Sequence, residues 1–231
     1  MSRVVALVLF IVLVAGGVLA PPAARSASPD LVVSQVFPGG GNSGAPFAND
    51  FVELFNRGST AVDVSGWTIQ YASASGATWQ ATALTGSIAP GRRYLVQLAS
   101  AAAVGAALPT PDVSGTTNMA VSGGKVAVVR DASGLSCGAS AGSCASVTSI
   151  ADMVGYGTAV DHEGGGPAPT LDNTTAAVRA DNGCTDTDVN STDFSAAAPT
   201  PRNSTAAVTT CGSVPPPSGG CLLYTSDAAD E

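Results

Sequence analysis

Charged residues are scarce in this chain of 231 residues, at 11% of the total, and aromatic residues make up only 5%. Lysine and histidine each occur once, at Lys125 and His162. A single histidine excludes most acid–base and zinc schemes, and the chain has neither an HExxH motif nor paired CxxC motifs. Clustered basic residues are also missing, so direct binding to nucleic-acid phosphates is not expected.

The residues that are abundant favour strands and loops. The chain has 27 Gly and 15 Pro, and Val and Thr are plentiful. Alternating or apolar stretches bounded by turn residues predict seven to nine short strands, including those near 31–37, 50–56, 94–98 and 125–130. An Ala-rich segment at 100–109 fits a short helix or a loop. This pattern predicts an all-β, immunoglobulin-like antiparallel sandwich with long Gly/Pro/Ser-rich loops.

The first 27 residues predict a signal peptide. Arg3 precedes an uncharged apolar run from Val4 to Leu19, and small residues follow it. The run is shorter than the roughly 20 residues that cross a membrane. We therefore expect a secreted or cell-surface protein without a membrane span in the mature chain. An uncleaved anchor is the alternative interpretation.

Cysteine spacing predicts two disulfide bonds. All five cysteines lie beyond residue 136, which suits an oxidising compartment. Cys137 and Cys144 enclose a short loop, and Cys184 and Cys211 would close a longer one. Cys221 is left over.

The last eleven residues, "CLLYTSDAADE" at 221–231, resemble a translated sequencing adapter. We interpret them as a non-native tail, which leaves four cysteines that pair without remainder. Residues 205–220 are then a disulfide-pinned end followed by a Pro/Gly/Ser linker. A linker of this kind predicts that the chain is the N-terminal part of a longer extracellular protein.

A candidate Ca²⁺ loop lies in "CTDTDVNSTDF". Asp186, Asp188, Asn190 and Asp193 place oxygen ligands at closely spaced positions, as Ca²⁺ sites do. Ser191 and Ala197 stand where an EF-hand needs Gly and Glu, so an EF-hand is excluded. In the alternative interpretation these side chains cap their own backbone N–H groups in an Asx-turn loop.

Three further patterns have simpler structural interpretations. The "GGG" at 39–41 lacks the Lys-Ser/Thr ending of a phosphate loop. His162 is expected in an exposed loop without catalytic partners. Among Trp67, Tyr71 and Trp79, which could stack on sugars or bases, only Trp79 is a candidate for an exposed face.

The stretches "LVVSQVF", "NDFVELFNRGSTAVDVSGWTIQYA", "GRRYLVQL" and "GGKVAVVRD" resemble the lamin tail domain, an immunoglobulin-like β-sandwich. The later "DMVGYGTAVDHEGGGPAPTLDNTTAAVRADNGCTDTDVNSTDF" is similar to the extended ending of the family's secreted bacterial branch. The resemblance predicts one domain over residues 28–204. Together with the strand pattern it places five residues in the core: Phe51, Leu54, Trp67, Ile69 and Tyr94.

The resemblance implies an accessory module that binds or positions a partner, with no cofactor unless the loop takes Ca²⁺. The partner class is an unknown protein or an extracellular polymer, and the sequence leaves the oligomeric state open. In the alternative, the chain is the N-terminal fragment of an extracellular nuclease or phosphodiesterase whose catalytic domain lies elsewhere. Metal-dependent phosphodiester hydrolysis needs clustered carboxylates with His or Lys around a metal, and these residue types are nearly lacking here.

Overall fold

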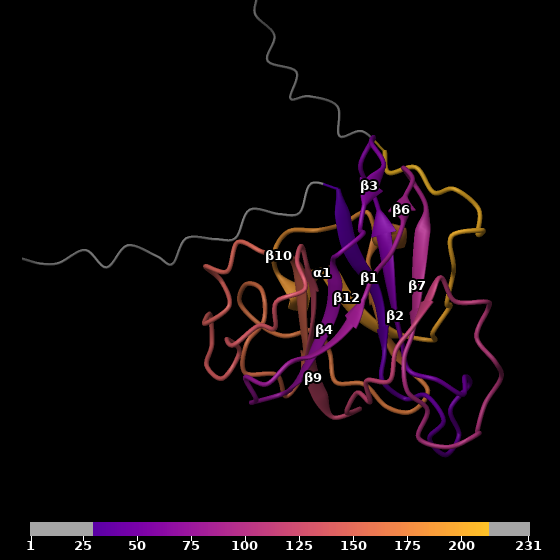
Figure 1. Cartoon of the computed structure of the whole chain (residues 1–231). Helices are drawn as coiled ribbons and strands as arrows, with labels where there is room; N and C mark the ends of the chain where they lie inside the picture. The colour runs from indigo at the N-terminus through magenta and orange to yellow at the C-terminus, as the bar shows by residue number, and fades with distance from the viewer. Residues whose placement is uncertain (1–29, 213–231) are drawn as a thin grey trace, which may run out of the picture.

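The computed structural model describes residues 30–212 (Figure 1). The predicted signal peptide, most of the linker and the adapter-like tail lie outside the described residues. Among residues 30–212 no helix has the length and apolar character that crossing a membrane requires.

Two sheets form an antiparallel β-sandwich, which confirms the predicted fold class. The larger sheet has the order β12-β11-β1-β2-β7-β8 and the smaller has the order β10-β9-β4-β5. The only parallel pair between named strands in the described chain joins β7 to β8. The strands of the larger sheet are β1 (Leu31–Phe37), β2 (Phe51–Asn56), β7 (Arg93–Gln97), β8 (Val113–Ser114), β11 (Ala176–Arg179) and β12 (Phe194–Ala197).

The smaller sheet contains β4 (Thr68–Ser73), β5 (Gln80–Ala83), β9 (Gly123–Val129) and β10 (Ile150–Gly157). A separate short ribbon pairs β3 (Val62–Asp63) with β6 (Ser87–Ile88). Helical structure in the described chain is limited to single turns, η1 (Asp181–Gly183) and α1 (Asn190–Asp193). The Ala-rich segment at 100–109 is a loop and not a helix.

The main core lies between the two sheets, where the inward residues of both pack together. Leu54, Ile69 and Tyr94 are buried there as predicted. Phe51 is also buried, but it belongs to a second cluster with Phe37 and Leu95, because it points to the opposite face of β2 from Leu54.

The prediction for Trp67 was only partly right. Trp67 packs against the main core but remains partly exposed, and the Arg130 guanidinium carbon lies 5.7 Å from its ring centroid. It stands just before β4, at the rim of the sandwich, where one face of a large ring stays in solvent.

Sequence patterns located most strands to within two residues but missed β12 and the two-residue strands β6 and β8. The sequence pattern ended the sheet near the strand at 176–179, because "FSAA" is short and lacks β-branched residues. In the structure β12 pairs with β11 along its whole length, and Phe194 fills the main core.

The two ends of the described chain lie at the same end of the molecule. The Arg57 backbone N–H donates to the Asp30 carbonyl at 2.7 Å, and the Arg57 guanidinium donates to the Cys184 carbonyl at 2.9 Å. Cys184 is bonded to Cys211, one residue before the described chain ends. The loops 38–49 and 98–111, which contain no charged residue, lie at the opposite end of the sandwich in Figure 1.

Candidate functional site

A buried charge centre lies where β10, β11 and the predicted Ca²⁺ loop meet. Arg179, the last residue of β11, is its middle. The Arg179 guanidinium contacts Asp152 at 2.8 Å, Asp186 at 2.9 Å and Asp193 at 3.4 Å. A second guanidinium, from Arg57, lies 3.2 Å from the other oxygen of Asp186.

The centre forms because β11 is shorter than the strand beside it. A β-bulge in β1 shifts the register between Val33 and Gln35, and β11 pairs only with the residues beyond the bulge. The Val33 N–H therefore donates to the Asp152 carboxylate at 2.6 Å, and Arg179 Nε donates to the Val33 carbonyl at 2.8 Å. Two charged side chains thus satisfy backbone groups that a longer β11 would have paired.

A single amide closes the outer edge of β10. Asn190 Oδ1 accepts from the Gly155 N–H at 2.9 Å and the Glu163 N–H at 3.1 Å. Asn190 Nδ2 donates to the Met153 carbonyl at 3.0 Å and to the Glu163 carboxylate at 3.3 Å. Asn190 is fully buried, so its amide replaces a neighbouring strand at this edge.

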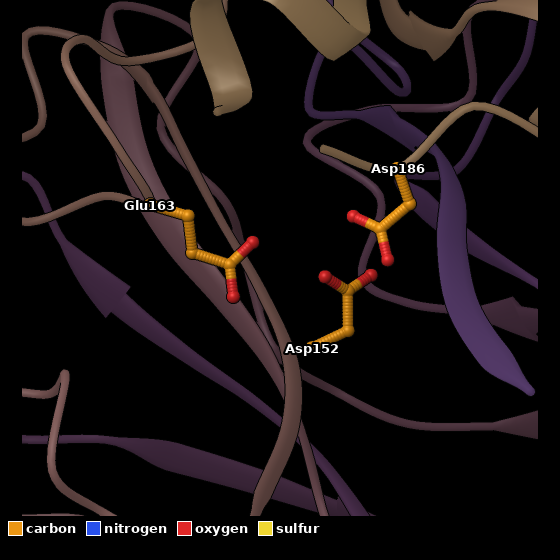
Figure 2. A group of neighbouring side chains, drawn as sticks. All are labelled: Asp152, Glu163 and Asp186. Atoms are coloured by element: carbon orange, nitrogen blue, oxygen red, sulfur yellow. The ribbon is translucent and has the colours of Figure 1, made fainter. Parts of the chain in front are cut away.

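Three carboxylates of this region could in principle hold a metal. Asp152, Glu163 and Asp186 each offer an oxygen within 4.8 Å of the others, and Figure 2 shows the three side chains directed toward one another. With Asp193 the centre has four carboxylates against two guanidinium groups, a formal charge of 2 − 4 = −2. In the structure the arginines provide the positive charge that a metal would otherwise supply.

Burial and neighbouring charges shift the pKa values of Asp186 and Arg179. Burial raises the pKa of Asp186, and the neighbouring Asp152 raises it further, while Arg179 and Arg57 oppose the shift. Burial by itself lowers the pKa of Arg179, but the surrounding carboxylates, led by Asp152, raise it above its ordinary value. Arg179 therefore remains charged, and the centre is held together as an ion network.

A family model of the lamin tail domain matches residues 24–158, more than half of the chain. The chain belongs to the lamin tail domain family. A search of curated proteins finds no match. The lamin tail domain is an immunoglobulin-like, non-catalytic domain family. The family match includes β1 to β10 and Asp152, whereas Arg179, Asp186 and both strands β11 and β12 lie beyond it.

The structure separates the four residues of the predicted Ca²⁺ loop. Asp186 and Asp193 share Arg179, Asn190 faces β10, and Asp188 has a positive φ of 55°. Asp193 accepts from the Thr187 N–H at 2.9 Å and from the Thr187 hydroxyl at 2.7 Å. This carboxylate therefore caps groups of its own loop, as in the alternative interpretation, but the donor lies six residues before it and not two after it, as in an Asx-turn. Ca²⁺ binding stays a prediction, and an ion would have to replace an arginine as the partner of Asp186.

The sequence patterns gave no indication that Arg179, Asp152 and Glu163 are partners of this loop. The one available signal was a charged residue within an apolar strand, as in "IADMVGYG", because such a residue needs a partner when the strand is buried.

Both predicted disulfides are present in this lamin tail domain. Cys137 is bonded to Cys144, and Cys184 is bonded to Cys211.

Two buried charged side chains hold the loop that contains the Cys137–Cys144 bond. The Asp161 carboxylate accepts from the N–H groups of Gly142 and Cys144. From β9, the Lys125 ammonium donates to four backbone carbonyls at 2.7–3.0 Å, those of Ser73, Ala74, Gly76 and Gly138.

The remaining candidates have structural positions. Trp79 is buried, and its indole N–H donates to the Cys137 carbonyl at 2.8 Å, so it is not an exposed binding aromatic. His162 is half-buried and not fully exposed as expected. At the Gly39–Gly41 turn, the Gly40 N–H donates to the Asp50 carboxylate, which occupies the place where a phosphate loop would hold an anion.

Every basic side chain in residues 30–212 donates to an acceptor of the fold itself. Guanidinium groups bind carbonyls or carboxylates, and the one ammonium is caged by carbonyls. The seven residues are Arg57, Arg92, Arg93, Lys125, Arg130, Arg179 and Arg202. Each of these charges therefore has an acceptor within the fold.

Proposed function

We propose that this chain is a non-catalytic, exported lamin-tail-type module that binds or positions a partner outside the cell. The observation that supports this most directly is the arrangement of its ends. Arg57 brings Asp30 and the Cys184–Cys211 bond together at one end of the sandwich. A chain that enters and leaves at one end presents the other end, with its uncharged loops, to a partner.

Export is supported by the two disulfides, because such bonds persist in oxidising compartments. The apolar N-terminal run adds the sequence feature that a secretion signal requires. We infer that residues 1–27 are removed and that the domain works at the cell surface or in the medium.

The alternative, an N-terminal fragment of a nuclease or phosphodiesterase, assigns catalysis to residues beyond this chain. Phosphodiester hydrolysis with a metal needs an accessible ion and a positioned nucleophile. In the charge centre Asp152, Asp186 and Asp193 are paired with arginines. The Glu163 carboxylate is buried and accepts from the Met153 N–H and the Asn190 amide, so the centre offers neither.

Turnover assays separate an enzyme from a non-catalytic module. Purified residues 28–220 should not hydrolyse plasmid DNA or bis(p-nitrophenyl) phosphate with millimolar Mg²⁺ or Ca²⁺. Hydrolysis at a rate that scales with protein concentration through repeated purification would contradict the proposal.

A reporter enzyme fused after residue 220 tests the positioning role. We expect the fusion to be retained on the cell surface through the uncharged loops. Ala103→Glu with Val104→Glu, both exposed in the 98–111 loop, should release the reporter into the medium. The matched control is Ala132→Glu in a different exposed loop, which should leave retention unchanged. Equal release by both variants would refute a binding end at these loops.

A further inference from the structure

The last part of the described chain crosses the larger sheet as a strap. We define the strap as residues 198–211, which follow β12 and end at Cys211. The strap passes over the face of β1, β2 and β7 that points away from the main core, and ends at the disulfide to Cys184. In Figure 1 it is the yellow segment beside β7.

Side chains of the sheet hold the strap through its main chain. The Gln35 amide makes a two-point contact with Thr200: its Nε2 donates to the Thr200 carbonyl at 2.8 Å, and its Oε1 accepts from the Thr200 N–H at 3.0 Å. Glu53 accepts from the Arg202 N–H at 2.8 Å. Contacts of this kind recognise an extended backbone whatever its side chains.

One side chain of the strap makes a specific contact with the sheet. The Arg202 guanidinium donates to Glu53 through Nη2 at 2.9 Å and through Nε at 3.2 Å. Glu53 is fully buried, and the Ser34 hydroxyl and the Gln35 amide hold it in place at 2.6 and 3.1 Å. This is the geometry by which a carboxylate selects arginine over other residues.

Further contacts fix the direction of the strap. Asp112 accepts from the backbone N–H and the hydroxyl of Ser204, and Arg92 donates to the Ala206 carbonyl at 2.6 Å. The Thr209 N–H donates to the Gly91 carbonyl at 3.0 Å. Gly91 has a φ of +70°, and a Cβ there would lie 2.6 Å from the Thr209 carbonyl oxygen, so only glycine lets the strap approach this closely.

The strap adds little to the hydrophobic core. Pro199 is its only buried residue, and Val208 is 52% exposed. Its contacts are mainly polar, and it supplies no strand of the larger sheet. It therefore resembles a peptide ligand bound to a finished domain more than an element of the fold.

We propose that the outer face of β1, β2 and β7 is a binding groove for an extended peptide that carries an arginine, and that the strap occupies this groove as an internal ligand held by the Cys184–Cys211 bond. The groove contributes Gln35 for the peptide backbone and Glu53 for the guanidinium group. Asp112 binds the residue two positions after the arginine. The proposal rests on the proposed function, a binding module, and adds to it a second binding surface, distinct from the uncharged loops, with its own class of partner.

The disulfide decides whether the groove is open. β12 tethers one end of the strap, and the bond to Cys184 tethers the other, so the strap has a high effective concentration at the groove. Removal of the Cys184–Cys211 bond and of the Arg202 guanidinium should weaken the binding of the strap to the groove. The groove residues themselves should stay in place. Cys184→Ser with Cys211→Ser and Arg202→Ala makes this change without altering any groove side chain.

Trypsin measures opening of the strap. In Cys184→Ser with Cys211→Ser, which retains Arg202, cleavage after Arg202 should be at least about tenfold faster than in the wild-type chain, because proteolysis follows the population of the open form. Cleavage after Arg130, which is exposed and lies outside the strap, serves as the internal control. Equal cleavage rates would show that the strap does not open and would overturn the proposal.

Peptide binding tests the groove itself. A fluorescent peptide with the strap sequence APTPRNSTA should bind the triple variant, with an affinity at least about tenfold higher than that of the same peptide with Ala in place of Arg. Adding Glu53→Gln to the triple variant should abolish the difference between the two peptides. Equal binding of both peptides to the triple variant, or no binding, would overturn the proposal.

A second measurement covers the case in which the triple variant does not fold. In the wild-type fold with both disulfides, Arg202→Ala should accelerate hydrogen exchange of the strap amides at 200–206 and leave those of β1 and β2 unchanged. Unchanged exchange in the strap would also overturn the proposal. The trypsin, peptide and hydrogen-exchange results do not affect the outcome of the reporter and turnover assays. Failure of the groove proposal is therefore distinguishable from failure of the proposed function.

Discussion

Asp152 Oδ2 lies 2.8 Å from Arg179 Nη2, and the two side chains divide the backbone groups of Val33 between them. This buried ion pair connects both sheets, since Asp152 belongs to β10, and Val33 and Arg179 belong to β1 and β11. It also lies at the junction between the family match and the C-terminal extension. Its role is to dock that extension onto the sandwich.

Arg179→Met should destabilise the domain strongly. The change leaves Asp152, Asp186 and Asp193 buried around an apolar side chain, and breaking a buried ion pair costs about 3–5 kcal/mol. Urea unfolding followed by circular dichroism measures the loss. Arg130→Met, at an exposed arginine, is the control and should cost far less. Comparable losses in the two variants would contradict the central role of Arg179.

Asp50 should make stability depend on pH. Burial raises its pKa to about 7, although the N–H groups of Met119 and Gly40 lower it. Between the ordinary pKa of an aspartate and pH 7, the folded chain therefore binds a proton at Asp50 that the unfolded chain does not bind. The free energy of unfolding should rise by about 2 kcal/mol as pH falls from 8 to 5.5. Stability from this group is lost as pH rises through 7.

The variant Asp50→Asn isolates this effect from that of Asp186, whose pKa is raised as well. We expect the variant to be less stable at pH 5.5 and to have a flatter profile. The two Asp50 oxygens accept from the Gly40 and Met119 N–H groups separately, and in Asn an NH2 group faces one of these donors. Chemical unfolding at several pH values provides the comparison. A variant with the same pH slope as the wild type would exclude Asp50 as the source.

The longer disulfide should stabilise the domain more than the shorter one. Cys184–Cys211 has a sequence separation of 27, and Cys137–Cys144 has one of 7. Loop entropy gives about 3.5 kcal/mol for the first and about 2.4 kcal/mol for the second. Melting of the two double Cys→Ser variants tests the order. The reverse order would show that contacts around Lys125, and not loop closure, dominate.

Lys125→Met should loosen the 131–149 loop. The ammonium group holds the Gly138 carbonyl and three carbonyls at the end of β4 and just after it, and each buried carbonyl left without a donor costs about 1–3 kcal/mol. Hydrogen exchange should rise in the disulfide loop and near residue 76, while β1 and β2 stay protected. Uniform acceleration over the whole domain would instead indicate global destabilisation.

Ca²⁺ should raise the melting temperature at millimolar concentration if the predicted loop binds it. Asp186→Ala and Asp188→Ala should abolish the rise. Because Arg57 pairs with Asp186 at 3.2 Å, Arg57→Met should enlarge the response by freeing a carboxylate oxygen. The same titration with Mg²⁺ is the control for ionic strength. No Ca²⁺-dependent shift in either the wild type or Arg57→Met would end this hypothesis.

The sequence by itself determined the fold class and the cysteine pairing. Alternation in stretches such as "WTIQYA" reflects the two faces of a half-buried strand, which is a local property of the chain. Cysteine spacing is also a local property of the chain. Without Cys221 of the adapter-like tail, it predicts the pairs Cys137–Cys144 and Cys184–Cys211. Four of the five predicted core residues are fully buried for these reasons, and only Trp67 at the rim is partly exposed.

Only the tertiary structure decided what the charged residues do. Glu53 and Arg202 are 149 positions apart, and Asp152 and Arg179 are 27 apart, so neither contact has a local signal. The loop at 186–193 has the oxygen spacing of a Ca²⁺ site. However, β11 ends at Arg179, shortly before this loop, and the Arg179 guanidinium lies among the carboxylates of the loop. Partners of buried charges are set by strand length and register across the sandwich, and these depend on the packing of the whole chain.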